Sequence, residues 1–397
     1  MKKSLLALAA LGAFAGVAHA QSSVTLYGII DQGINLVTNV KTATGSAHLY
    51  NMSSGVMQGS RWGLRGAEDL GGGLKAVFVL ENGFDLGTGA IGLGGLLFGR
   101  QAYVGLSSSQ FGAVTLGRQY DSVVDYIGPL IAADQWSGYI GAKPGDVDNF
   151  NNAFRTNNAI KFTSVNYAGL QFGGMYSLGG QAGNFTENQT WSLGGSYNNG
   201  PLSLAAGYLN ARTPSNAGGL MGNNTTTTTP GKIGAGTPVY SGFLSANTYQ
   251  VIGVAGNYTF GAATFGLNYS NVSFRNLGAN GATNFERGTN ATFNNAEVNF
   301  KYQFTPALLG GLAFDYVDRG SVTKANGTST GTAKYFQYQI GTDYFLSKRT
   351  DVYVIGIYQH ATGTDSTGNA AVAAINNLTA SSGPNQFTAR VGIRHKF

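Results

Sequence analysis

The stretch from Arg118 to Arg155 concentrates the side chains of this chain that could do chemistry. It has an arginine at each end and carries five carboxylates: Asp121, Asp125, Asp134, Asp146 and Asp148. It interrupts a series of alternating segments, because residues 111–120 and 157–167 on either side have the pattern of strands. A connection this long without a period of its own is uncommon in a compact domain and is usually functional. It predicts a loop folded into a barrel, where it narrows a water-filled pore, with a solvated surface loop as the alternative.

Charges arranged in this way would act on passing solutes rather than on a chemical bond. Opposite charges on facing walls of a narrow, low-dielectric passage set up a transverse field. Such a field orders water and polar solutes while letting ions through, and its net sign biases ion selectivity.

Enzyme chemistry finds little support elsewhere in the chain. After residue 20 there are three histidines, of which His48 lies in an expected loop, His360 near a long loop and His395 at the terminus. They suggest neither a nucleophilic triad nor a metal cluster. The adjacent acids Glu68 and Asp69 lie at a short turn, where solvation explains them. We therefore expect no enzyme activity, no catalytic residue, no cofactor and no metal.

The first twenty residues, MKKSLLALAALGAFAGVAHA, have two lysines, an apolar run and small residues at the end. This is the pattern of a Sec signal peptide cleaved after Ala20. The apolar run is too short for a transmembrane helix. The formal charge of +6 drops by the two lysines that the signal peptide carries, and no basic run indicates nucleic acid. The absence of cysteine excludes a disulfide scaffold.

The elements that must position the charged stretch are long alternating strands. In residues 24–37 the even positions are mainly apolar and the odd positions largely polar, which is a period of two. About 9–11 residues suffice to cross a bilayer as a tilted strand. In residues 385–397, Phe387, Val391 and Ile393 alternate with Arg390 and Arg394. Cations facing lipid would be costly, so the alternation predicts a polar lumen.

The spacing of the strands predicts an up-and-down barrel. Fourteen further segments have the same character: residues 58–69, 73–85, 98–108, 111–120, 157–167, 169–178, 189–198, 201–212, 247–260, 263–275, 291–304, 307–319, 333–346 and 350–360. Short turns alternate with long polar connections, namely the opening loop and residues 213–245, 276–290, 320–332 and 361–384. We expect about sixteen antiparallel strands in one transmembrane all-β domain over residues 21–397. The low-complexity residues 223–229 are expected to be external and mobile.

Aromatic residues recur near the strand ends, at Tyr258, Phe260, Tyr302, Phe304, Tyr344 and Phe345. An aromatic girdle at a membrane interface would place them there, although soluble β-proteins also carry aromatics at strand ends. Two other classes therefore stay open at this point, an exported β-sandwich adhesin and a barrel enzyme. A sandwich would show the same alternation with the cations on its wet surface.

Four segments follow one another in a characteristic order: SSVTLYGIIDQGINL, SRWGLRGAEDLGGGLKAVFVLE, FGRQAYVGLSSSQFGAVTLGRQYDSVVDY and the terminal RVGIRHKF. In these segments the chain resembles the trimeric general porins of Gram-negative outer membranes, in particular those of betaproteobacteria. The resemblance covers the whole chain after the signal peptide. It implies sixteen strands, a homotrimer in outer-membrane lipid, an inward-folded third loop and passive diffusion of ions and small hydrophilic solutes.

The resemblance also implies which charges form the constriction. Arg61, Arg118 and Arg155 match the family's wall arginines by local motif, and Arg100 matches in part. The expected constriction comprises Arg61, Arg100, Arg118, Arg155, Asp121, Asp125 and Asp134. Arg118 shares its strand face with two apolar residues, so a β-bulge or the start of the loop would have to re-aim it. The loop reads DQWSGY at residues 134–139, unlike the Pro-Glu-Phe-Gly-Gly tip of enterobacterial members, which leaves open which acids line the gap.

The sequence indicates the preferred solute less clearly than it indicates the fold. The mildly basic balance and the wall arginines favour a mild preference for anions, which the loop carboxylates would oppose. A substrate-specific channel would call for a ladder of aromatic side chains or a dense row of lysines along the lumen, and the sequence shows neither.

Overall fold

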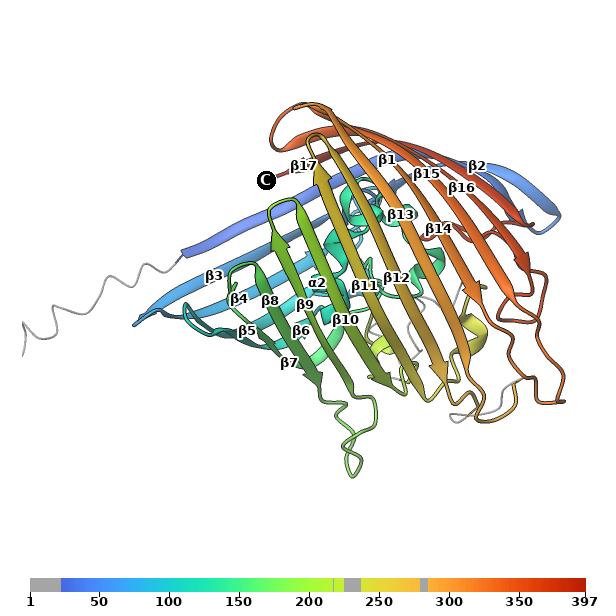
Figure 1. The fold of residues 1–397 in the computed structure, drawn as a ribbon, viewed down its shortest axis with the longest axis horizontal. Helices are drawn as coiled ribbons and strands as arrows, with labels where there is room; N and C mark the ends of the chain where they lie inside the picture. The colour runs from blue at the N-terminus through green and yellow to red at the C-terminus, as the bar shows by residue number, and fades with distance from the viewer. Residues whose placement is uncertain (1–22, 217, 225–236, 279–284) are drawn as a thin grey trace, which may run out of the picture.

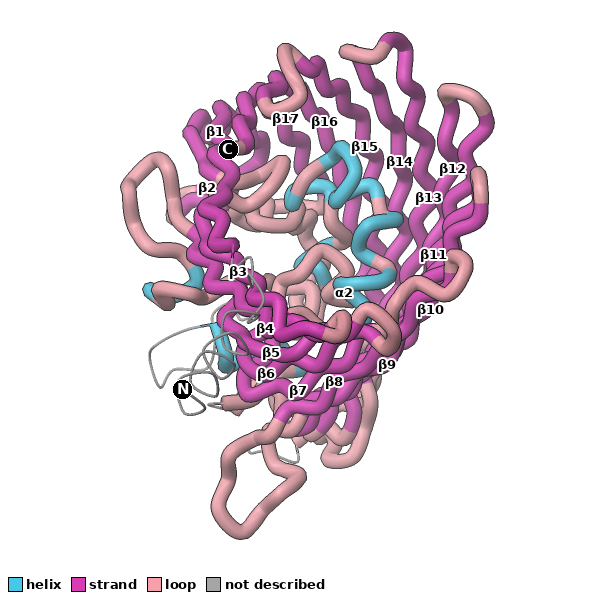
Figure 2. Tube along the Cα trace, turned by 90° about the vertical axis from the view of Figure 1, so that its left-hand side faces the viewer, coloured by secondary structure: helices cyan, strands magenta, loops and turns pink. Residues whose placement is uncertain are grey.

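The chain folds into one closed antiparallel sheet around a wide lumen (Figures 1 and 2). The structure is a computed structural model that describes residues 23–397 except 217, 225–236 and 279–284. The expected signal peptide and most of the low-complexity run lie outside the described residues. No helix in the described part of the chain has the length and apolarity to span a bilayer.

Seventeen strands are present in the described residues. They are β1 Ser23–Thr42, β2 Gly45–Ser54, β3 Arg61–Gly71, β4 Leu74–Gly83, β5 Gln101–Ser108, β6 Gly112–Gln119, β7 Thr156–Thr163, β8 Leu170–Ser177, β9 Thr190–Asn199, β10 Leu202–Arg212, β11 Thr248–Phe260, β12 Ala263–Arg275, β13 Ala291–Thr305, β14 Leu308–Arg319, β15 Ala333–Phe345, β16 Thr350–Gly363 and β17 Asn385–Lys396. Short helical turns occupy Leu93–Gly95 (η1), Leu220–Asn224 (η6) and Ser241–Phe243 (η7).

The ring closes between the first and last strands. β1 pairs with β17 on one side, and on the other side its two halves pair with β3 and β2 in turn. Because β2 and β3 share one place in the ring, the seventeen strands form a sixteen-stranded barrel, as expected. The backbones of Gly28 and Phe397 exchange two hydrogen bonds of 3.1 and 3.0 Å. Closure leaves no free sheet edge, and it excludes the β-sandwich.

The alternation of apolar and polar residues in the sequence corresponds to the outer and inner faces of the barrel. In β17, Val391 is 60% exposed on the outer face, whereas Arg390 is fully buried on the inner face. Phe260 and Phe304 are exposed on the outer face near the short turns, as an aromatic girdle requires. Phe345 differs, because it packs partly buried against the cluster around Trp136.

Short turns join the strands at one end of the barrel and long loops at the other (Figure 1). The predicted opening loop is wrong. Residues 45–54 instead form β2, joined to β1 by a tight hairpin with Thr42 paired to Gly45. Nearly all of β2 is exposed on both faces, so its sequence lacks the alternation that marks a strand with one buried face. Residues 55–60 then turn inward, where Val56 and Met57 are buried.

One long connection lies inside the ring rather than outside it. Residues 120–155, between β6 and β7, carry the helix α2 (Ser122–Tyr126) and the turns η2 (Gly128–Leu130), η3 (Ala133–Ser137), η4 (Tyr139–Gly141) and η5 (Pro144–Asp146). Figure 2 shows these turns within the circle of strands. We call residues 120–155 the inward loop. Its position confirms the expected inward-folded third loop.

Candidate functional site

The inward loop begins with a capped helix. The Asp121 carboxylate accepts hydrogen bonds from the backbone N–H groups of Val123 (2.9 Å) and Val124 (3.3 Å), as an N-cap does. It also accepts one from the side chain of Asn149 (2.7 Å), which ties the start of the loop to its return. Asp121 is fully buried, and burial raises its pKa to about 7. Contrary to the sequence prediction, this carboxylate does not face the open lumen.

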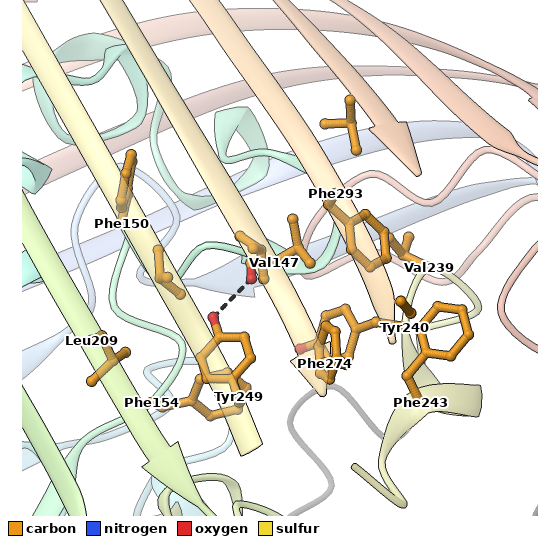
Figure 3. Close-up of a cluster of buried hydrophobic side chains, with 14 of the residues drawn as sticks. Val147, Phe150, Phe154, Leu209, Val239, Tyr240, Phe243, Tyr249, Phe274 and Phe293 are labelled. Carbon is orange, nitrogen blue, oxygen red and sulfur yellow. Dashed lines mark hydrogen bonds between the residues drawn. The ribbon is translucent and has the colours of Figure 1, made fainter. Parts of the chain in front are cut away.

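Glycines in the barrel wall make room for the loop's large side chains. A Cβ atom at Gly311 would lie 2.3 Å from the Trp136 ring, and one at Gly341 would lie 2.8 Å from it. Phe150 approaches Gly253 in the same way, at 2.3 Å. Figure 3 shows Phe150 and Phe154 against the wall, with the Tyr249 hydroxyl donating to the Val147 carbonyl at 2.8 Å. The Trp136 and Phe150 side chains of the loop therefore occupy space that is free only because the wall residues beside them are glycines.

Polar side chains of the wall hold the loop backbone. The Glu297 carboxylate accepts from the Ala132 N–H at 2.9 Å, and Gln339 donates to the Gly141 carbonyl at 2.9 Å. Lys143 forms a buried ion pair with Asp148 at 3.1 Å and donates to Asn268 at 2.7 Å. Asp148 is thus neutralised within the loop's packing.

Three of the predicted arginines come together where the inward loop returns to the wall near β3 to β5. Arg100 forms a 2.8 Å ion pair with Glu81 and donates to the Tyr120 hydroxyl at 2.9 Å. Arg61 lies 4.0 Å from the same Glu81 carboxylate. The Arg155 guanidinium lies over the Tyr120 ring, 5.7 Å from its centroid, and burial followed by repulsion from Arg100 lowers its pKa. We call Arg61, Arg100 and Arg155 the arginine cluster.

Arg118 stands beside the arginine cluster because the strand is irregular there. The register of β6 with β7 shifts between Gly117 and Gln119, one residue before the strand ends, so the shift lies at the place where a β-bulge or the start of the loop was expected to re-aim Arg118. Leu116 is 50% exposed on the outer face, whereas Arg118 is 9% exposed. Its guanidinium donates to the Gly99 carbonyl (2.7 Å) and to Asn157 (2.5 Å). These two hydrogen bonds hold the Arg118 side chain against the wall.

The remaining two predicted acids differ from each other. Asp125 forms an ion pair with Lys161 of β7, which also donates to the Tyr120 carbonyl at 3.0 Å. Asp134 is exposed and accepts from Asn151 at 2.7 Å. Desolvation raises the pKa of Asp134 to about 7, although the charges of Arg61 and Arg100 act to lower it. Asp134 is thus the predicted loop acid that is open and subject to the field of the arginine cluster.

Lys161 and Glu81 were missed in the sequence analysis, although strand parity could have found both. Lys161 alternates with outward Ile160 and Phe162 in β7. Glu81 is the acid on the inner face of β4, at 3% exposure. An ionisable residue in phase with the inner face of a barrel strand has to face the lumen.

A cavity of about 530 Å³ lies on the long-loop side of the inward loop. Part of its wall comes from the β16–β17 loop (residues 364–384), which the sequence analysis described as a polar connection. The Ala374 N–H donates to Gln359 at 2.5 Å, and Asn376 donates to the Tyr139 carbonyl at 2.9 Å. The apolar run AAVAAI at residues 370–375 departs from that description, and Ala373, Ala374 and Ile375 are buried. We call this cavity the vestibule.

A closed barrel with an apolar outer face, a polar lumen and a charged inward loop defines the class of membrane channels with an aqueous pore. The Gram-negative porin family matches residues 7–366 of the chain. An outer membrane porin protein of Bordetella pertussis is 34% identical over 386 residues, which cover 90% of this chain and 94% of that protein. The chain belongs to the Gram-negative porin family. It is an outer-membrane porin, a general diffusion channel and not an enzyme, and the resemblance to betaproteobacterial porins is confirmed.

Solved structures show the same fold. An anion-selective porin from Comamonas acidovorans superposes with a TM-score of 0.70 at 24% identity, covering 95% of this chain and 100% of that one. The trimer form of OmpT of Vibrio cholerae superposes with a TM-score of 0.61 at 17% identity, covering 95% of this chain and 99% of that one.

Proposed function

We propose that this porin passes ions and small hydrophilic solutes through a constriction with a preference for anions. The arginine cluster forms one side of the constriction and Asp134 forms the other. The observation that carries the proposal is the unequal charge at this place. Arg61 and Arg100 share the single carboxylate of Glu81, and Arg155 lies over the Tyr120 ring, while the loop acids Asp121 and Asp148 are buried and Asp125 is paired.

An excess of fixed cations in a low-dielectric passage raises the local concentration of anions and lowers that of cations. The effect is strongest where the walls approach each other, because fixed charges there are screened least by salt. The ion pair of Asp125 with Lys161 adds no net charge. The field across the constriction is therefore directed from the arginine cluster to Asp134, with a positive balance.

The test is the reversal potential of a planar bilayer under a potassium chloride gradient. Replacing Arg61, Arg100 and Arg155 together by glutamine should lower the chloride-to-potassium permeability ratio by roughly severalfold, with smaller steps for the single variants. Arg349→Gln is the matched control, because Arg349 is exposed at a short turn. An unchanged ratio in a triple variant that still shows heat-modifiable migration would remove the arginine cluster from the constriction.

We further propose that the porin is a homotrimer. The support is the apolar outer face of β1 and β5, where Val24, Leu26, Val104 and Leu106 are exposed. The trimer form of OmpT shares the fold. Light scattering of detergent-solubilised, unheated protein should give three times the mass of the heated chain. A single-chain mass under mild detergent would contradict the trimer.

We also propose that residues 1–20 are a Sec signal peptide that is removed on export. The support is the charged, apolar and small-residue order of this segment. The intact mass of protein purified from outer membranes should correspond to a chain beginning at Gln21. A mass that includes Met1 would contradict cleavage.

A further inference from the structure

The vestibule combines two kinds of lining that a passage for fully hydrated ions does not need. Its floor carries Arg100 and Arg155 of the arginine cluster. Its sides carry apolar residues from three different loops: Leu93, Pro238, Ile375, Leu378 and Ala380. We propose that the vestibule is a binding site for organic monoanions with an apolar body, such as aromatic carboxylates. The proposal rests on the anion preference proposed above and adds which anions the channel favours.

The cationic end of the site is Arg155. Its side chain is 4% exposed, and its Nε atom has no hydrogen-bond partner among the residues that the structure describes. Its Nη1 contact with the Ala153 carbonyl is long, at 3.5 Å. A buried guanidinium with unused donors is unfavourable until an acceptor reaches it. A carboxylate matches the fork of guanidinium donors with two parallel hydrogen bonds.

The apolar end is held in place by the β16–β17 loop. Besides the Ala374 and Asn376 contacts, the Gln386 side chain accepts from the Ile375 N–H at 3.3 Å and donates to the Thr379 carbonyl at 2.8 Å. These bonds hold the loop so that Leu378, which packs against the buried Ile375, is partly exposed at the vestibule. Leu93 of the β4–β5 loop is also partly exposed there. Apolar area facing an aqueous lumen is covered favourably by the apolar body of a solute. The 530 Å³ volume lies within the range of small-molecule sites, roughly 300–1,000 Å³.

The acid that also lines the vestibule opposes this binding only weakly. The two Asp146 oxygens accept the backbone N–H groups of Asn151 (3.0 Å) and Ala153 (2.8 Å). Its charge is therefore directed into the loop backbone. Arg100 is already paired with Glu81, so Arg155 is the guanidinium that is left to bind a single negative charge on the solute.

The experiment compares two anions of the same charge and nearly the same shape, benzoate and nicotinate, as blockers of the chloride current through single channels. The wild-type channel should be half-blocked by benzoate at a severalfold lower concentration than by nicotinate. The variant carrying Leu93→Asn and Leu378→Asn should lose this difference and keep its chloride-to-potassium permeability ratio. Leu97→Asn is the matched control, because Leu97 is exposed in the same loop and does not line the vestibule.

Equal half-blocking concentrations in the wild-type channel would overturn the vestibule site. A difference that persists in the double variant would overturn it as well. If the double variant does not assemble, the single variants Leu93→Asn and Leu378→Asn should each narrow the difference, and no narrowing in either one would overturn the site. A wild-type channel that shows no preference for chloride over potassium would instead contradict the proposed function. The failure of the vestibule site and the failure of the proposed function are therefore distinguishable.

Discussion

At the scale of the residue, identical side chains have different tasks according to what surrounds them. Arg61, Arg100 and Arg155 meet around Glu81 and Tyr120, where their charge can act on solutes. The Arg118 guanidinium instead donates hydrogen bonds to the Gly99 carbonyl and to Asn157 in the barrel wall. The loop carboxylates divide in the same way, because Asp121 caps a helix whereas Asp134 is open. Counting charges in the sequence therefore overstates how many of them face the pore.

Asp146 gives the selectivity a dependence on pH. Burial, together with the neighbouring charge of Asp148, raises the pKa of Asp146 to about 7. Acidification from pH 8 to pH 6 should protonate it, remove a negative charge from the vestibule and increase the chloride preference. Reversal potentials measured across this range test the prediction.

The Asp146→Asn variant should show a smaller step, with a remainder from Asp134 at the constriction and from Asp121, whose pKa values are also raised to about 7. The raised pKa of Asp146 also sets the direction in which the stability of the fold changes with pH. The contribution of Asp146 to folding is fully present below the unfolded pKa of about 4 and is lost as the pH rises through about 7. A step of the opposite sign, or an undiminished step in Asp146→Asn, would contradict the assignment.

At the scale of the element, the inward loop is a preformed part of the wall rather than a free flap. Trp136 packs with Ala132, Leu309 and Ala313, and the wall glycines Gly311 and Gly341 admit its ring. Side chains of β13 and β15 bind the loop backbone at the same time. The width of the pore therefore depends on glycines that lie far from the loop in sequence.

Trp136→Ala should loosen the loop by roughly 3 to 5 kcal/mol, the usual cost of truncating a buried tryptophan. The expected signs are noisier open-channel current and faster amide exchange in residues 128–142, with the barrel intact. Phe185→Ala is the control, because Phe185 is an exposed aromatic in the β8–β9 loop.

Gly311→Ala should have a similar effect, since its Cβ would occupy the position of the Trp136 ring. The two changes should not add in the double variant, because they disrupt one contact. Full additivity would contradict the shared packing site.

At the scale of the whole molecule, the barrel depends on a buried seam where the first and last strands meet. Arg390 of β17 donates to Asn35 of β1 at 2.8 Å, to the Tyr353 hydroxyl of β16 at 2.9 Å and to the Ser53 carbonyl of β2 at 3.0 Å. It also pairs with Asp31 at 3.4 Å. One side chain therefore joins four strands from both ends of the chain.

Arg390→Leu should destabilise the barrel by about 3 to 5 kcal/mol, because it leaves the buried Asp31 without its cation. The temperature at which the protein loses its heat-modifiable migration should fall. Arg349→Leu, at an exposed turn, should leave that temperature unchanged. An equal shift in both variants would contradict a specific role for the seam.

The sequence by itself determined the barrel, because an inside and an outside require a period of two that each strand carries locally. The expected strands agree with the observed ones to within a few residues at most ends, for example residues 263–275 and β12. The sequence analysis missed β2, because both faces of this strand are exposed and its sequence therefore shows no alternation of apolar and polar residues. It also missed the inward course of the β16–β17 loop, despite the apolar run at residues 370–375.

Only the tertiary structure decided which charges meet. Arg61 and Glu81 come from β3 and β4, and Arg100 directly precedes β5. The loop acids turn toward solvent, toward lysines or toward backbone N–H groups according to the fold of the inward loop. Such pairings depend on the positions of groups far apart in the chain, and on burial that no local pattern reports. The short-range periodicity of the sequence therefore determines the class of protein, whereas contacts between residues far apart in the chain determine the charge balance of the pore.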